Sequence, residues 1–137
     1  MQTLEAMAKS DAFGVGLPMC GFHLDGRYAK LGDLARLGGK VCIATNRNPG
    51  SAPSPSMPMA IALAVRHCGL SPSQAITAAT LNPAAMLGFA DRGYIAAGAR
   101  ADLILLRHDD ERALAYEVGD NPVETVIIGG QVISREL

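Results

Sequence analysis

The chain has 137 residues, which is enough for one domain with a hydrophobic core. Hydrophobic residues make up 49% of it and charged residues 18%, a balance typical of globular rather than disordered proteins. Lys and Arg number 12 and Asp and Glu 13, and aromatic residues are only 4%. The sequence therefore offers neither a basic stripe nor stacking platforms, and nucleic acid is not an expected partner.

The cysteines Cys20, Cys42 and Cys68 form no Cys-x-x-Cys pair, and their odd number argues against a disulfide framework. We expect three small apolar fillers in a reducing, cytoplasmic setting. Charged residues within the first eleven positions interrupt any signal-peptide core. The longest apolar helix candidate, residues 57–65, is far shorter than the roughly 20 residues of a membrane span, so no membrane partner is expected.

The first half of the sequence alternates helical and strand patterns, which predicts a parallel β/α unit. In chain order we expect a helix at 2–9, a buried strand at 12–17, a loop at 19–30, a helix at 31–37 closed by Gly38 and Gly39, and a second buried strand at 41–45.

The second half begins with three helices and ends in a β-rich tail. The helices are expected at 57–68, at 72–80 behind a Ser71 to Gln74 capping box, and at a short segment opened by Asn82 and Pro83 and closed by Gly88. Strands are expected at 94–95, 102–106, 123–128 and 132–133.

Residues 46–58 hold four prolines and three serines, a composition typical of a flexible linker. They also follow the carboxyl end of a predicted buried strand, where β/α proteins place their ligand-binding loops. Both interpretations stay open on composition alone.

Three segments together resemble the amidohydrolase superfamily. Residues 44–51 (ATNRNPGS) are similar to the Ala-Thr-Asp-x-Asn-Pro-Gly-Ser/Thr element after the last barrel strand of imidazolonepropionases. Residues 70–87 resemble that family's helix pair, and residues 93–106 (GYIAAGARADLILL) resemble the superfamily motif that opens a small β-sandwich. Leu17-Pro18 also fits the loop after the seventh strand.

The resemblance implies an α/β fold, namely the C-terminal part of a metal-dependent β/α (TIM-like) barrel. Residues 1–90 would supply the last two strands and their helices, and residues 91–137 would supply a portion of the β-sandwich. Since a whole barrel needs about 250 residues, the chain is expected to be a fragment.

The family's reaction is hydrolysis of the cyclic C–N bond of 4-imidazolone-5-propanoate to N-formimidoyl-L-glutamate, in histidine degradation. A zinc or iron ion, held by a His-x-His pair, another His and an Asp, lowers the pKa of the attacking water. In this chain Asn46 occupies the position of that Asp. An amide is a poor metal ligand and takes no proton, so we expect no bound metal and an inactive isolated chain.

None of the three histidines lies in His-x-His spacing. His67 is expected at a helix end and His108 in a solvated turn. His23 falls in a loop after the first strand, where it is either a plain loop residue or a substrate contact.

The residues that match the family's substrate side are Asn48, Gly50 and Ser51. By resemblance, Asn48 and Gly50 would contact the product and Ser51 the imidazolone substrate, a small molecule. Gly50 lets backbone approach a ligand, and exposed amides before a helix suit a carboxylate. The alternative is that Asn48 to Ser51 is only a tight turn. By contrast, Asp102 is expected to be structural, with its carboxylate bonded to local amides.

Three interpretations of function remain: a truncated amidohydrolase, a non-catalytic remnant that binds a small carboxylated ring compound, or a structural module of that superfamily. An upstream reading frame that encodes His-x-His and the missing strands would favour the first. Unpaired strand edges also predict self-association.

Overall fold

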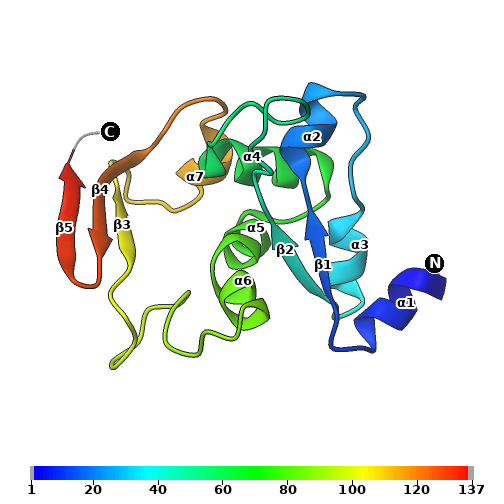
Figure 1. Ribbon diagram of the computed structural model, residues 1–137, viewed down its shortest axis with the longest axis horizontal. Coiled ribbons are helices and arrows are strands. Elements are labelled where there is room, and N and C mark those ends of the chain that lie inside the picture. The colour runs from blue at the N-terminus through cyan, green and yellow to red at the C-terminus, as the bar shows by residue number, and fades with distance from the viewer. Residues whose placement is uncertain (1, 136–137) are drawn as a thin grey trace.

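The computed structural model describes residues 2–135 of the chain. Helices and strands alternate in the N-terminal two thirds, and an antiparallel sheet ends the chain (Figure 1). In order the elements are α1 (Gln2–Ala8), β1 (Phe13–Gly16), α2 (Pro18–His23), α3 (Leu31–Arg36), β2 (Lys40–Ile43), α4 (Met57–His67), α5 (Pro72–Ala79), α6 (Leu81–Met86), β3 (Leu103–Leu106), α7 (Ala113–Tyr116), β4 (Val123–Ile128) and β5 (Gln131–Arg135).

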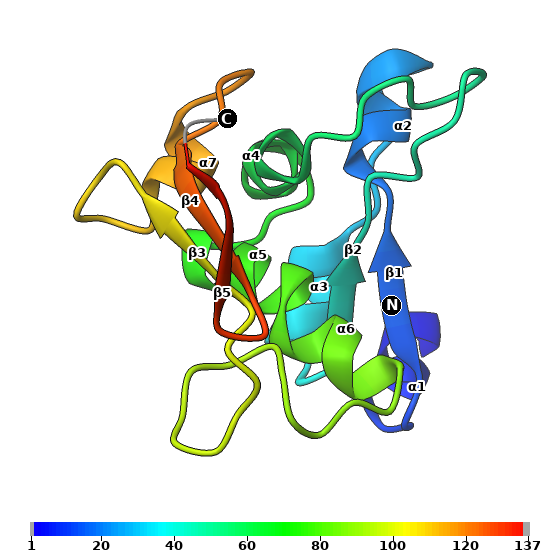
Figure 2. The ribbon, with the colours of Figure 1, turned by 60° about the vertical axis from the view of Figure 1, so that its left-hand side comes forward.

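The fold contains two separate sheets, and the predicted α/β class is confirmed. Strands β1 and β2 pair in parallel, as the helix–strand alternation predicted. Strands β3, β4 and β5 form an antiparallel sheet in that order. Both views place helices α5 and α6 between the two sheets (Figures 1 and 2).

Helix α3 covers one face of the parallel pair, and the other face is exposed at β1 but buried at β2. A Cβ atom on Gly14 or Gly16 would lie 2.5 Å from a side-chain atom of Leu34 or Leu31, so α3 packs directly on the backbone of β1. Because side chains alternate along a strand, Val15 points to the other face, where it is 47% exposed. Cys42, which pairs with Val15 on that face, is buried, so the uncovered part of the face lies at β1.

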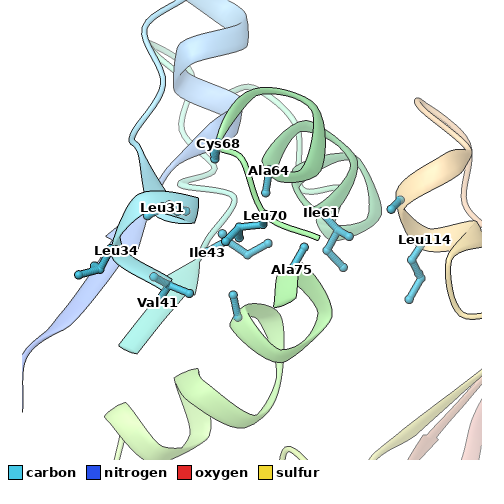
Figure 3. Close-up of a cluster of buried hydrophobic side chains, with 12 residues drawn as sticks. Leu31, Leu34, Val41, Ile43, Ile61, Ala64, Cys68, Leu70, Ala75 and Leu114 are labelled. Atoms are coloured by element: carbon cyan, nitrogen blue, oxygen red, sulfur yellow. The ribbon is translucent and has the colours of Figure 1, made fainter. Parts of the chain in front are cut away.

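Helix α4 lies at the centre of the hydrophobic core. Its residues Ile61 and Ala64 pack in one cluster with Val41 and Ile43 of β2 and with Leu114 of α7 (Figure 3). Figure 3 shows α3 and α5 contributing side chains to the same cluster. Helix α4 thus connects the parallel sheet to the segment that leads into the C-terminal sheet.

The predicted capping box of α5 is confirmed, and a Ser side chain that the sequence analysis did not single out caps α4. The Ser71 hydroxyl accepts from the backbone N–H of Gln74, and the Gln74 side chain accepts from the backbone N–H of Ser71, which completes the capping box of α5. Ser56 caps α4 by accepting from the backbone N–H of Met59 at 3.2 Å.

Asp102 is structural, as predicted. Its carboxylate accepts from the backbone N–H of Gly129 at 2.8 Å and from the Arg100 guanidinium at 2.8–2.9 Å. The Gly129 hydrogen bond, followed by the bond and charge of Arg100, lowers the pKa of Asp102. The carboxylate therefore links the start of β3 to the turn between β4 and β5.

Several predicted elements were wrong. Residues 18–23 form α2 rather than a loop. Pro18 begins this helix, and its residues Met19 and Gly21 are buried. Residues 94–95 form no strand, since they pair with no strand among residues 2–135, and Ile95 is 88% exposed.

Two further differences concern helices. Helix α7 was missed because a polar turn hides its short apolar segment. Asn82 does not begin α6, whose N-cap residue is Thr80. The side-chain amide of Asn82 instead donates to the carbonyl of Val41 at 2.7 Å. Within the described residues, no helix is long and apolar enough to cross a membrane.

The contact between α3 and the turn after α4 makes a testable prediction. A Cβ on Gly32 would lie 2.1 Å from the carbonyl oxygen of Gly69, and neither backbone has room to move. We expect Gly32→Ala to lower the free energy of unfolding by about 1–3 kcal/mol, measured by urea denaturation. Gly50→Ala is the control, because a Cβ there meets only Asn48 Oδ1 at 3.5 Å. Equal unfolding midpoints for the two variants would contradict this packing.

Candidate functional site

The candidate site lies at the carboxyl ends of the two parallel strands. Helix α2 follows β1, and the loop of residues 44–56 follows β2, so both connections leave the same edge of the sheet (Figures 1 and 2). The strand ladder extends one step further, because the backbone N–H of Ala44 donates to the carbonyl of Gly16 at 3.1 Å. The loop that the sequence singled out is thus placed where β/α proteins bind ligands.

Asn46 occupies a conformation that few residue types tolerate. Its φ is 50°, the one positive value among the described non-glycine residues, and Asn adopts this left-handed region more readily than most. The side chain is exposed, yet its Nδ2 lies 3.0 Å from Sγ of Cys20 and 3.3 Å from Oγ of Ser51. Asn46 therefore links the loop that follows β2 to helix α2, which follows β1.

Asn48 holds the loop together through its carboxamide. Oδ1 accepts from the backbone N–H of Gly50 at 2.9 Å and of Ser51 at 2.8 Å. Nδ2 donates to the carbonyl of Asn46 at 2.7 Å and to Oγ of Ser51 at 2.8 Å. Because a backbone N–H only donates and a carbonyl only accepts, these contacts fix the orientation of the amide.

These hydrogen bonds bear on the predicted substrate contacts. The amides of Gly50 and Ser51, expected to face a carboxylate, donate instead to Asn48. Backbone bonds between Asn48 and Ala52 in both directions close the same turn. The conformation described here is thus a braced tight turn. A ligand that used these amides would have to replace Asn48 Oδ1 as their acceptor.

A small apolar cluster anchors the turn to the helices. Ala52 is fully buried against Met19 of α2 and against Ala60 and Leu63 of α4. Cys20 packs at the edge of this cluster. The interpretation of residues 46–58 as a free linker is therefore wrong for its central part, since burial of Ala52 ties the loop to the core.

The described residues include no group of three or more His, Cys, Asp or Glu side chains that could hold a metal ion. His67 ends α4, as predicted, and stacks on Tyr28 with ring centroids 4.4 Å apart. Nε2 of His108 lies 2.6 Å from the Glu117 carboxylate, a contact that the sequence did not reveal. His23 ends α2 and is exposed.

Two of the three cysteines are the buried fillers that the sequence predicted. Cys42 and Cys68 are buried, and burial raises the pKa of both thiols. Cys20 differs, because it is partly exposed and its sulfur contacts the Asn46 amide. Its position two residues after Leu17-Pro18, just past the end of a strand, was the signal that sequence reasoning missed.

Away from the candidate site, a cavity of about 770 Å³ lies between α4 and α7. Among its lining side chains, Arg112 forms an ion pair with Asp110, and His108 contacts the carboxylate of Glu117. Arg66 donates to the carbonyls of Ala115 and Tyr116 and so binds α7 to α4. The cavity shares no lining residue with the strand-end loops.

Sequence comparison relates the chain to known proteins. A model described as "Amidohydrolase family" matches residues 21–133. The imidazolonepropionase of Herpetosiphon aurantiacus is 42% identical over 131 residues, which cover 94% of this chain and 31% of that protein. The imidazolonepropionase of Deinococcus deserti is 44% identical over 123 residues, covering 90% and 31%. The chain thus spans about a third of the length of these curated relatives.

Solved structures support the fold. A zinc-bound adenosine deaminase from Xanthomonas campestris superposes with a TM-score of 0.83 at 23% identity, covering 96% of this chain and 34% of the deaminase. The E. coli guanine deaminase gives 0.77 at 16% identity, covering 99% and 37%. At these identities the likeness is one of fold alone.

The hydrogen bonds of Asn48 predict a distinct effect of its loss. Asn48→Ala removes the acceptor for two loop amides, so we expect faster hydrogen exchange at Gly50 and Ser51 and a loss of about 1–3 kcal/mol in the free energy of unfolding. Asn121→Ala is the matched control, because that side chain accepts from a single amide, Val123 N–H. Unchanged exchange in Asn48→Ala would show that the turn does not depend on this carboxamide.

Proposed function

Because the chain belongs to the amidohydrolase family, we propose that it is the C-terminal part of an imidazolonepropionase-type hydrolase. The supporting observation is the braced Asn-Pro-Gly-Ser loop at the carboxyl end of β2, in a chain 37–44% identical to proteins named imidazolonepropionase. The proposed substrate is 4-imidazolone-5-propanoate, a small molecule, and the product is N-formimidoyl-L-glutamate.

In this proposal β1 and β2 are the last two strands of a β/α barrel within residues 1–90, and residues 91–137 are a portion of a β-sandwich. The exposure of the apolar side chain of Val15 on β1 supports a requirement for further strands. The exposed apolar side chains of the second sheet, including Ile104, Val132 and Ile133, support the same requirement there. Unless further strands complete the two sheets, their exposed strand edges favour self-association of the chain.

The residues of this chain do not fit a catalytic metal by themselves. The described part holds no cluster of metal-binding side chains, and the amide of Asn46 turns its nitrogen toward Cys20 and Ser51. Zinc or iron is therefore proposed for the completed enzyme and not for the isolated chain. What this chain would contribute is the substrate-facing loop with Asn48, Gly50 and Ser51.

A second candidate function follows from Asn46. An amide at this position takes no proton from water, so a completed protein would bind the ring compound without hydrolysing it efficiently. This candidate function is that of a non-catalytic binding module. Such a module would differ from the proposed enzyme in its rate of substrate turnover and not in what it binds.

The metal content of the isolated chain is directly measurable. We expect less than one tenth of an equivalent of zinc or iron after purification and dialysis, determined by elemental analysis, because Asn46 supplies no anionic ligand. A stoichiometric, tightly bound ion that is lost in Asn46→Ala would contradict this expectation.

The enzyme proposal is tested by supplying the missing part of the barrel as a second chain, taken from one of the curated relatives. We expect the pair to bind 4-imidazolone-5-propanoate but to turn it over slowly, and Asn46→Asp to raise kcat by about 10²–10⁴, the usual contribution of a positioned general base. Steady-state assays with zinc present give the comparison, and Asn121→Asp is the control. Equal rates within about threefold would show that residue 46 is not the missing base, whereas no binding at all would refute the substrate assignment.

A further inference from the structure

We propose that Cys20 is a positioning residue, whose thiol acts with Ser51 to orient the side chain of residue 46 so that Oδ1 is left free for a ligand. The inference rests on the proposed function for its meaning, but the contacts that carry it are independent of any substrate. It assigns a role at the site to a cysteine that neither composition nor motif singled out.

The contact joins the ends of two strands. Cys20 belongs to α2, which follows β1, and Asn46 belongs to the loop that follows β2. The Asn46 amide nitrogen lies between Sγ of Cys20 at 3.0 Å and Oγ of Ser51 at 3.3 Å. Within residues 2–135, Oδ1 of Asn46 accepts no hydrogen bond, so it is the polar atom of this amide left for a ligand.

Both sides of this contact are fixed to the same core. Met19, next to Cys20, is buried with Ala52, which belongs to the loop that carries Asn46. On α2 itself, a Cβ on Gly21 would lie 2.4 Å from the carbonyl oxygen of Arg27, so the helix has little freedom to rotate. The segment that carries Cys20 is therefore packed closely both on the loop and on the residues that follow α2.

The loop side is equally constrained. Asn48 donates to the carbonyl of Asn46 at 2.7 Å, which fixes the peptide beside the left-handed residue. Ser51 accepts from Nδ2 of Asn48 at 2.8 Å and from Nδ2 of Asn46. With backbone and hydroxyl both fixed, the thiol is the remaining contact that selects the direction of the Asn46 side chain.

The chemistry of the two holding groups explains why they suit this position. A thiol and a hydroxyl each donate and accept, so they would hold the amide of Asn46 by accepting or a carboxylate at the same position by donating. In either case one oxygen would remain free. A free Oδ1 is an acceptor, and the ligand group that it would meet is a hydrogen-bond donor such as the N–H of a cyclic amide.

The test measures the mobility of the Asn46 side chain by NMR relaxation of its NH₂ group, in the full 137-residue chain without substrate or metal. We expect an ordered side chain, with an order parameter of about 0.85, in the unmodified chain. We expect the same in Cys20→Ser, because the serine hydroxyl can still accept the hydrogen bond from Asn46. In Cys20→Ala the value should fall below about 0.6. Cys68→Ala is the control, because this cysteine is buried in the other cluster.

An unchanged order parameter in Cys20→Ala overturns the proposal, as does a Cys20→Ser variant that is as mobile as Cys20→Ala. Cys20→Val, which keeps volume but has no acceptor, replaces Cys20→Ala if that variant does not fold. A double-mutant cycle with Asn46→Ala should show non-additive unfolding constants by about threefold to tenfold, and additivity within twofold also counts against the role. Failure of hydrolysis by a completed enzyme would leave all these readouts unaltered.

Discussion

The burial of helix α4 on nearly every side is the constraint on which the remaining structure depends. Ala60, Ala62 and Ala64 have no exposed surface, and their small side chains let neighbouring elements approach closely. One side of α4 packs on β2 and α5, another packs on α2 and the loop, and Arg66 near its end binds α7. A single apolar helix thus fixes the position of the parallel strands, of the strand-end loop and of the connection to the second sheet.

The packing of α4 also holds the loop of residues 44–56 in place. Ala52 is buried against α4, and the carboxamide of Asn48 then arranges the backbone between the strand and that anchor. The residues proposed to contact substrate are therefore also the residues that hold the loop in shape. A ligand that took the amides of Gly50 and Ser51 would compete with Asn48 for them, so its binding would be coupled to the folding of this segment.

Asn46 shows why a change of one functional group can leave a site intact in shape but altered in chemistry. The left-handed backbone, the thiol of Cys20 and the hydroxyl of Ser51 accommodate an amide at a position where the sequence resemblance implies a carboxylate. Shape is preserved because the two groups are nearly isosteric. Charge and proton affinity are not preserved, and these are the properties that hydrolysis requires.

Much of the local structure followed from residue types that act on their nearest neighbours. Ser71 and Gln74 cap α5 wherever it lies, Gly38 and Gly39 follow the end of α3, and alternation of helices and strands predicted the parallel pair. The motif at residues 44–51 identified the position of the candidate site. By contrast, α2 was missed because its burial comes from α4 and Ala52, which lie far away in the sequence. The strand at residues 94–95 was wrong because a strand needs a partner, and pairing is not a property of the segment itself.

The sequence by itself determined the capping box of α5, the family resemblance and the presence of an amide at residue 46, where that resemblance implies an acidic residue. Only the tertiary structure decided that Cys20 meets Asn46, that Asn82 bonds to Val41, and that His108 pairs with Glu117. The physical reason is the distance along the sequence over which each interaction acts. Capping and turn formation depend on groups within a few residues, whereas these three contacts depend on how helices pack on strands, which no local pattern records.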